Sequence, residues 1–66
     1  VRAGAGVSLL RAALRDRHPR VVAEAARALG AIGAGEAARD LEALARDSRE
    51  DEVREAAAEA LSLLRR

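Results

Sequence analysis

The chain has one histidine, His18, which is the first candidate for metal binding or acid–base chemistry. A zinc site takes three or four ligands from His, Cys and carboxylate side chains. The chain has no cysteine and no second histidine, so His18 lacks the partners that such a site needs. His18 also stands directly before Pro19, where the backbone is pushed away from helical geometry. We therefore expect an exposed turn residue at position 18 and no metal site.

Carboxylates and hydroxyls are the other groups that could do chemistry. Paired carboxylates work as acid and base only where an apolar environment raises one pKa, and the chain has no aromatic residue or Met to build one. Ser8, Ser48 and Ser62 have no histidine partner suggested by the sequence. The Gly-Ala-Gly segments at residues 4–6 and 33–35 do not follow a strand, which favours helix ends over phosphate loops. The sequence thus predicts a protein that is not an enzyme and has no cofactor.

All twelve basic residues are arginine, which raises the question of nucleic-acid binding. Five of them could contact phosphates from the first half of the chain: Arg11, Arg15, Arg17, Arg20 and Arg27. Against this, the formal net charge is only +1, no aromatic side chain is available to stack on a base, and five acidic residues lie between positions 50 and 59. Nucleic-acid binding is therefore disfavoured. The charges are instead divided, with net +4 in residues 1–33 and net −3 in residues 34–66.

The composition predicts one small helical domain with a thin core. Half of the 66 residues are hydrophobic, and alanine supplies most of them. Alanine favours helix but removes little apolar area from water, so such a piece gains stability from neighbours. No apolar run approaches the roughly 20 residues of a membrane span. The lack of cysteine favours a cytoplasmic location, and the opening VRAGAG without an initial Met suggests a piece of a longer protein.

These candidate residues are positioned by a predicted helix over residues 19–32. Pro19 suits its first turn, and Gly30 and Gly33 are expected to weaken its far end. At about 100° per residue, one face carries the residues expected to be buried, which are Val21, Ala25, Ala28, Leu29 and Ile32. The opposite face carries the residues expected to be exposed, which are Arg20, Ala23, Glu24, Arg27 and Ala31.

Three further helices are predicted at about residues 6–15, 36–46 and 52–64, with residues 1–6 as an N-terminal tail. The helix over residues 6–15 has Leu9 among its inward residues, and the helix over residues 36–46 has an expected ion pair between Glu42 and Arg46. Asp47, Ser48 or Asp51 could cap the last helix. Its exposed arc is expected to contain Glu52, Glu55, Ala56, Glu59 and Leu63.

The chain contains an internal repeat. A shift of 32 residues places Val21, Ala25 and Leu29 on Val53, Ala57 and Leu61. Two helix-turn-helix units, each with a stripe too narrow to close on itself, predict an all-α fold, an α-solenoid segment of two antiparallel helix pairs. The units are residues 7–33 and 34–66. The same shift sets Arg20 beside Glu52 and Arg27 beside Glu59, which predicts ion pairs that fix the register of neighbouring helices.

The segments DRHPRVVAEAARALGAIG and DSREDEVREAAAEALSLL resemble HEAT repeats, specifically the short alanine-rich class also found in phycobilisome-lyase-type proteins. The first segment carries the pattern in Asp16, Pro19, Val21 and Gly30, with Ala25, Ala28 and Leu29 between them. The second carries it in Asp47, Val53, Arg54, Ala57, Ala60 and Leu61. Two positions depart from the pattern: Val22 replaces the usual arginine, and Ser62 replaces the usual glycine and marks a terminal repeat.

The resemblance implies a right-handed stack whose second helices line a concave side that holds other macromolecules. We therefore expect a non-enzymatic protein-interaction module with an unidentified protein partner. Its expected binding surface consists of Arg20, Ala23, Glu24, Arg27, Glu52, Glu55, Glu59 and Leu63. The exposed ends of two repeats also predict self-association, head to tail or two-fold. The alternatives are an accessory or lyase-type role on a tetrapyrrole-bearing partner, and a nucleic-acid-binding HEAT-like domain.

Overall fold

The computed structural model describes residues 3–66, with side chains described from residue 6 onward. These residues form four α-helices and one short 3₁₀ turn: α1 (Ala3–Ala13), α2 (Pro19–Ala31), η1 (Gly35–Ala37), α3 (Ala38–Asp47) and α4 (Asp51–Leu64). The described part of the chain contains no strand, so the all-α prediction is confirmed. None of its helices has the length and apolar character needed to cross a bilayer.

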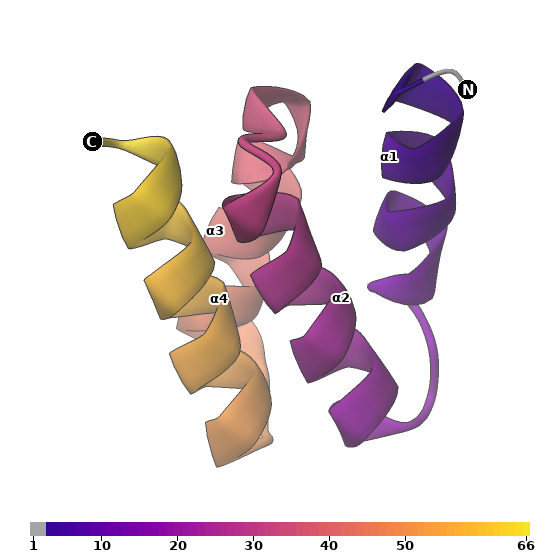
Figure 1. Ribbon diagram of the computed structural model, residues 1–66. Helices are drawn as coiled ribbons and strands as arrows, with labels where there is room; N and C mark the ends of the chain where they lie inside the picture. The colour runs from indigo at the N-terminus through magenta and orange to yellow at the C-terminus, as the bar shows by residue number, and fades with distance from the viewer. Residues whose placement is uncertain (1–2) are drawn as a thin grey trace.

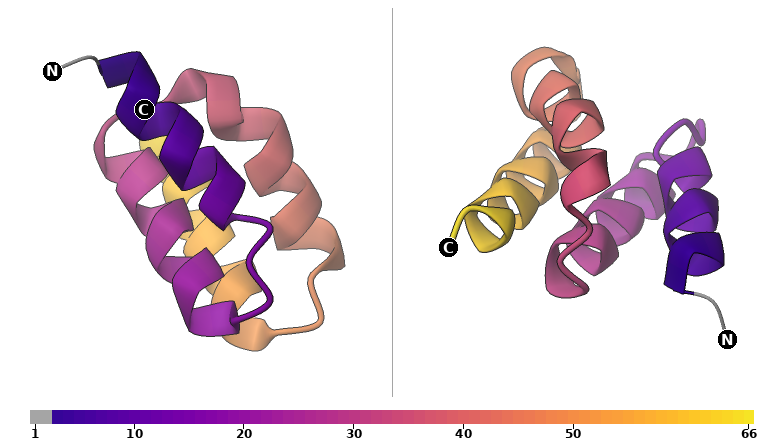
Figure 2. Two further views of the ribbon diagram at one scale, coloured as in Figure 1. Left: turned by 90° about the vertical axis from the view of Figure 1, so that its right-hand side faces the viewer. Right: turned by 90° about the horizontal axis from the view of Figure 1, so that it is seen from above.

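The helices form two antiparallel pairs, α1 with α2 and α3 with α4 (Figure 1). The second helices of the pairs, α2 and α4, run side by side in the same direction. In Figure 1, α3 lies behind α2 and α4, and α1 lies on the side of α2 away from α4. The views in Figure 2 show the same order from the side and from above. The result is a thin slab, with extents of 34 × 27 × 15 Å.

Short local signals set both ends of α2. Before the helix, the Asp16 carboxylate accepts a 2.9 Å hydrogen bond from the backbone amide of His18, which closes the turn, and Pro19 then occupies the first turn of the helix. After it, Gly33 has φ 73°, a left-handed conformation that suits glycine. The amides of Gly33 and Ala34 bond back to the carbonyls of Gly30 and Leu29, which makes a Schellman cap. Gly33 therefore ends the helix, as the sequence predicts.

The second unit uses different residues for the same turn. The Ser48 hydroxyl accepts a hydrogen bond of 3.2 Å from the amide of Glu50. This bond is equivalent to the one that Asp16 accepts from the amide of His18 in the first unit. Glu50 is the N-cap residue of α4 and its side chain makes no capping bond, so the cap predicted from Asp47, Ser48 or Asp51 is wrong. Asp51 begins α4 and pairs with Arg54, where its charge also favours the helix dipole.

Two local predictions in the first and third helices are corrected. The first helix begins at Ala3, so residues 3–6 are not the expected tail, while residues 1 and 2 lie outside the described residues. Leu9, expected to face inward, is 74% exposed because none of the other described helices packs on that side of α1. Glu42 pairs with Arg65, the C-cap residue of α4, at 2.6 Å, and Arg46 pairs with Asp47, so the predicted pair of Glu42 with Arg46 is wrong. The division into units at residues 33 and 34 stays a prediction.

The core is one continuous cluster in which alanine predominates. Its largest fully buried side chains are Leu29 of α2 and Leu41 of α3. Around them lie eight buried alanines and the branched side chains of Val7, Leu14, Val22, Val53 and Leu61. Because alanine has a short side chain, helices that meet through it approach closely and gain contact through short separation more than through buried area.

The buried face of α2 is turned from the predicted one. Ala23, expected to be exposed, is 1% exposed, whereas the supposedly inward Val21 and Ile32 are 38% and 57% exposed. The physical reason is that α2 is covered on two sides. One side packs on the hydrophobic core, and the adjoining side packs on α4. The flank toward α4 consists of small residues, which a hydrophobic pattern does not separate from a solvent-exposed face. Ala56 of α4, also expected to be exposed, is fully buried for the same reason.

Gly30 marks a close approach of α2 and α4. It lies inside α2, and a Cβ atom added there would stand 2.6 Å from the Cα of Ala60 and 2.9 Å from its Cβ. Contacts that short are repulsive, so only glycine fits without a shift of the helices. Gly30 therefore admits α4 at this point, a role that the sequence does not predict, and the expectation that it weakens the end of the helix stays a prediction.

Replacing Gly30 with Ala is expected to destabilise the protein by about 1–3 kcal/mol through overpacking, although Ala favours helix by up to about 1 kcal/mol. Gly6→Ala is the matched control, since Gly6 lies in α1 and a Cβ there meets nothing within 4 Å. We expect that control to be neutral or stabilising. Urea unfolding followed by circular dichroism measures both, and a Gly30→Ala variant as stable as the parent would contradict the close contact.

Candidate protein-binding surface

The exposed faces of α2 and α4 form the surface on which most of the predicted binding residues lie. The two helices run side by side in the same direction (Figure 1), and Gly30 of α2 packs closely on Ala60 of α4. Seven of the eight predicted residues are exposed, namely Arg20, Glu24 and Arg27 on α2 with Glu52, Glu55, Glu59 and Leu63 on α4. We call these seven residues the charged face. Ala23 is excluded from it, because its side chain is buried on the flank of α2 toward α4.

One ion pair crosses the charged face. The Nε of Arg27 donates to the Oε1 of Glu59 at 3.2 Å, which confirms the pairing predicted by the shift of 32 residues. Both side chains stay in contact with solvent, at 48% and 62% exposure, so the pair is of the weak surface kind. Within the described residues, Arg20 and Glu52 make no ion pair, so the second predicted pairing is wrong.

The two helices contribute opposite charge to this face. Arg20 and Arg27 outnumber Glu24 on α2, whereas the three charged-face residues of α4 other than Leu63 are all glutamates. Arg54 does not offset them there, because its guanidinium bonds the Ser48 carbonyl at 2.7 Å and the Asp51 carboxylate at the start of the helix. Leu63, 40% exposed, adds an apolar side chain at the far end. The face is thus a basic row beside an acidic row.

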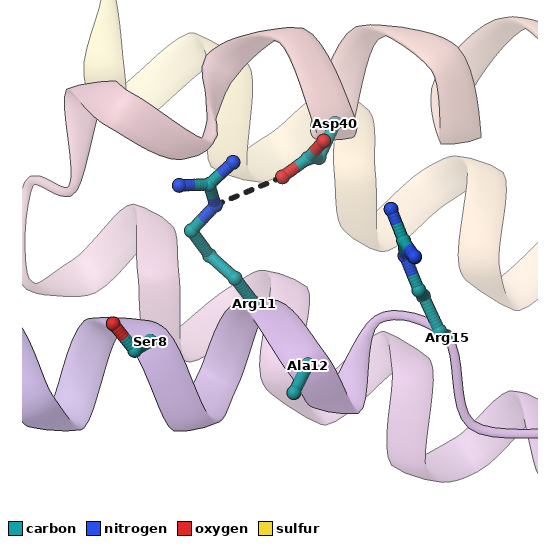
Figure 3. Close-up of a pocket in the computed structure, with 5 residues that line it drawn as sticks. All are labelled: Ser8, Arg11, Ala12, Arg15 and Asp40. Carbon is teal, nitrogen blue, oxygen red and sulfur yellow. Dashed lines mark hydrogen bonds and ion pairs between the residues drawn. The ribbon is translucent and has the colours of Figure 1, made fainter.

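A second polar surface lies between α1 and α3, where the sequence did not predict a site. The Nε of Arg11 donates to Asp40 at 3.0 Å, and this pair closes one side of an open cavity of about 290 Å³ (Figure 3). Ser8, Ala12 and Arg15 line the rest of it. The spacing of 29 residues between Arg11 and Asp40 differs from the repeat length, so the alignment of the two units gave no signal for this contact.

The groups considered for catalysis and metal binding take structural positions in turns and on surfaces. The His18 Nδ1 lies 2.9 Å from the Asp16 Oδ1, and the His18 side chain is 71% exposed. Hydrogen bonds from the amide and then the imidazole of His18 hold the pKa of Asp16 below its usual value. The described residues contain no group of three or more His, Cys, Asp and Glu side chains arranged to hold a metal ion.

Taken together, two stacked antiparallel helix pairs with parallel second helices define an α-helical repeat protein. A family model for HEAT repeats matches residues 2–62. The chain therefore belongs to the HEAT-repeat family, whose repeats generally mediate protein–protein interaction and generally act as non-enzymatic scaffolds. No curated protein and no solved structure gives a significant match to the chain.

Removing the Asp16 carboxylate, as in Asp16→Ala, is expected to lower stability at neutral pH. A carboxyl whose folded pKa is lowered contributes stability that is fully present above its unfolded value of about 4 and is lost as pH falls through the lowered value. The difference between parent and variant should therefore shrink below about pH 4. Urea unfolding at pH 7 and in acid tests this, with the exposed Glu36→Ala as control; a difference that grows in acid would contradict it.

The pair of Arg27 and Glu59 is expected to couple the two helices by at most about 1 kcal/mol, because both side chains are hydrated. A double-mutant cycle with Arg27→Ala and Glu59→Ala measures the coupling, which should fall as salt is added. The same cycle on Arg20 and Glu52, which make no ion pair, is the control and should give a value near zero. Equal coupling in both cycles would show that the observed contact has no energetic effect of its own.

Proposed function

We propose that the protein is a non-enzymatic interaction module that binds a protein partner through the charged face. The observation that carries the proposal is the arrangement of this face, a basic row on α2 beside an acidic row on α4, held in register by the close packing at Gly30. Opposite charges in two parallel rows favour a partner with the reverse arrangement, because complementary potentials guide encounter and penalise wrong partners.

The exposed apolar side chain of Leu63 supports the charged face as a binding surface, because a partner that covers it removes apolar area from water. It is one of four large hydrophobic side chains that are exposed in the described residues, and it follows Glu59 by one helical turn. An exposed apolar side chain beside charged residues is a feature of protein interfaces, which combine apolar and polar contacts. We place the module in the cytoplasm, as the absence of cysteine favours.

The two alternative functions rank lower. The basic residues considered for nucleic acid are divided between two surfaces, since Arg11 and Arg15 line the cavity beside α3 while Arg20 and Arg27 lie on α2. A tetrapyrrole would need a larger apolar cleft than the polar cavity of about 290 Å³ beside Arg11. Neither alternative has a specific observation in its favour.

Reversing two charges of the acidic row, as in Glu52→Lys with Glu59→Lys, is expected to weaken partner binding at least about tenfold, or about 1.4 kcal/mol. The matched control is Glu36→Lys with Asp47→Lys, which changes the net charge equally but outside the charged face. Affinity capture from the source cells with parent, variant and control identifies partners, and titration of each captured partner gives the affinity. Equal binding by all three proteins would show that the charged face is not the binding surface.

A further inference from the structure

Two adjoining cavities lie between α1 and α3. The larger one, of about 290 Å³, is the polar cavity shown in Figure 3. The smaller one, of about 170 Å³, shares Arg11, Arg15 and Asp40 with it and is also lined by Leu14 and Leu44. Because the same three charged residues line both cavities, the two form one continuous depression with a polar part and an apolar part. We call it the α1–α3 groove.

One wall of the α1–α3 groove carries two arginines. Ser8, Arg11 and Arg15 are three and four residues apart, so they lie on one side of the helical turns. The amide of Arg15 bonds the carbonyl of Ala12 at 3.0 Å, which continues the turn beyond the end of α1 at Ala13. Both guanidinium groups extend toward α3 (Figure 3). This wall therefore presents two positive charges, each with a planar fork of hydrogen-bond donors.

The positive charge of the groove is only partly neutralised. The Nε of Arg11 bonds the Asp40 carboxylate at 3.0 Å, and its two terminal nitrogens have no hydrogen-bond partner among the described residues. Arg15 makes no ion pair with any described residue. Among the residues that line the groove, two positive charges thus face one negative charge. One further carboxylate would balance them.

Apolar surface lies beside these charges. Leu14 is 7% exposed and belongs to the hydrophobic core, and Leu44 packs against that core while staying partly exposed. Asp40 and Leu44 are four residues apart on α3, so they lie on the same face of that helix. A ligand whose anionic group reaches the arginines therefore also has apolar surface within about one helical turn of its charge.

We propose that the α1–α3 groove binds an acidic peptide segment of a partner protein, in which a glutamate stands next to a leucine or another large aliphatic residue. The carboxylate pairs with Arg15 and with the terminal nitrogens of Arg11, as carboxylates commonly do with guanidinium forks. The aliphatic side chain covers Leu14 and Leu44 and removes their exposed area from water.

The shape of the groove favours a peptide over a small molecule. Small-molecule sites enclose most of the ligand's surface, whereas this groove is open to solvent along its length. An extended chain can contact both cavities at once. The groove shares no residue with the charged face, so either binding surface can fail without the other.

Peptides that differ at one residue test the proposal. The probe is the peptide Gly-Ser-Glu-Leu-Gly-Ser, capped at both ends so that the glutamate carries its only charge. Titration followed by heteronuclear NMR measures weak affinities and shows which amides respond. We expect shifts in α1 and α3. We also expect affinity to fall about fivefold or more with glutamine in place of the glutamate, and about threefold or more with serine in place of the leucine.

Variants of the protein should change this affinity in opposite directions. Arg15→Gln is expected to weaken binding about fivefold or more, because it removes the guanidinium that has no ion pair. Asp40→Asn is expected to strengthen binding about threefold or more, since it removes a negative charge and releases the Nε of Arg11. A damaged fold does not raise affinity, so the gain separates the effect of charge from unfolding. Arg49→Gln, exposed and outside both surfaces, is the matched control and should bind as the parent does.

Several results would overturn the proposal. One is an absence of detectable binding by the glutamate peptide at millimolar concentration. Another is an affinity that Arg15→Gln leaves unchanged or that Asp40→Asn lowers. Equal affinity for the glutamine peptide would show that the carboxylate is not recognised, and equal affinity for the serine peptide would show that the apolar surface is not used. Shifts confined to α2 and α4 would assign the peptide to the charged face instead.

Discussion

The close packing of α2 against α4 is the contact on which the rest of the structure depends. It occurs where Gly30 approaches Ala60, at a distance that leaves no room for a Cβ on the first of these residues. Because the helices touch nearly backbone to backbone there, their relative height and direction are narrowly defined. The register of the two repeats, the pair of Arg27 with Glu59 and the alignment of the basic and acidic rows all follow from this contact.

An alanine-rich core explains why this geometry matters so much. Among the larger side chains from residue 6 onward, only Leu29 and Leu41 are fully buried, so the apolar area removed from water is modest for each helix. Close approach compensates in part through many short dispersion contacts. It also leaves each repeat dependent on its neighbour, as in other proteins built by stacking.

The two ends of the slab differ for reasons that the internal repeat makes clear. Ala23 and Gly30 are buried between the units, and their counterparts Glu55 and Ser62 are polar and exposed. The reverse holds for Asp40, which contacts α1 and has the exposed, apolar Leu9 as its counterpart. A stacked protein must exchange small or apolar residues for polar ones where stacking stops, because a bare apolar end would associate without control. The far side of α4 carries such polar residues in Glu55 and Ser62, whereas the apolar Val21 and Ile32 are exposed on α2.

The sequence by itself determined the helices, their approximate limits and their duplication. Those features rest on local causes: Pro19 at a helix start, Gly33 in a left-handed cap, and a shift of 32 residues that superimposes Val21 and Leu29 on Val53 and Leu61. It also predicted the contact of Arg27 with Glu59, since that follows from the repeat. Most of the charged face could be predicted in the same way, because long charged side chains stay in water wherever their helix lies.

Only the tertiary structure decided which faces of α2 and α4 are buried. Alanine and glycine are compatible with both a buried and an exposed position, so the pattern of one helix predicts Ala23 and Ala56 as exposed and does not show that Gly30 contacts α4. Val21 and Ile32 were placed wrongly in the opposite sense, because an apolar side chain is buried only where something packs on it. The physical reason is the same in both cases. A residue is buried only where a second surface packs on it, and the hydrophobic pattern of one helix contains no information about that second surface.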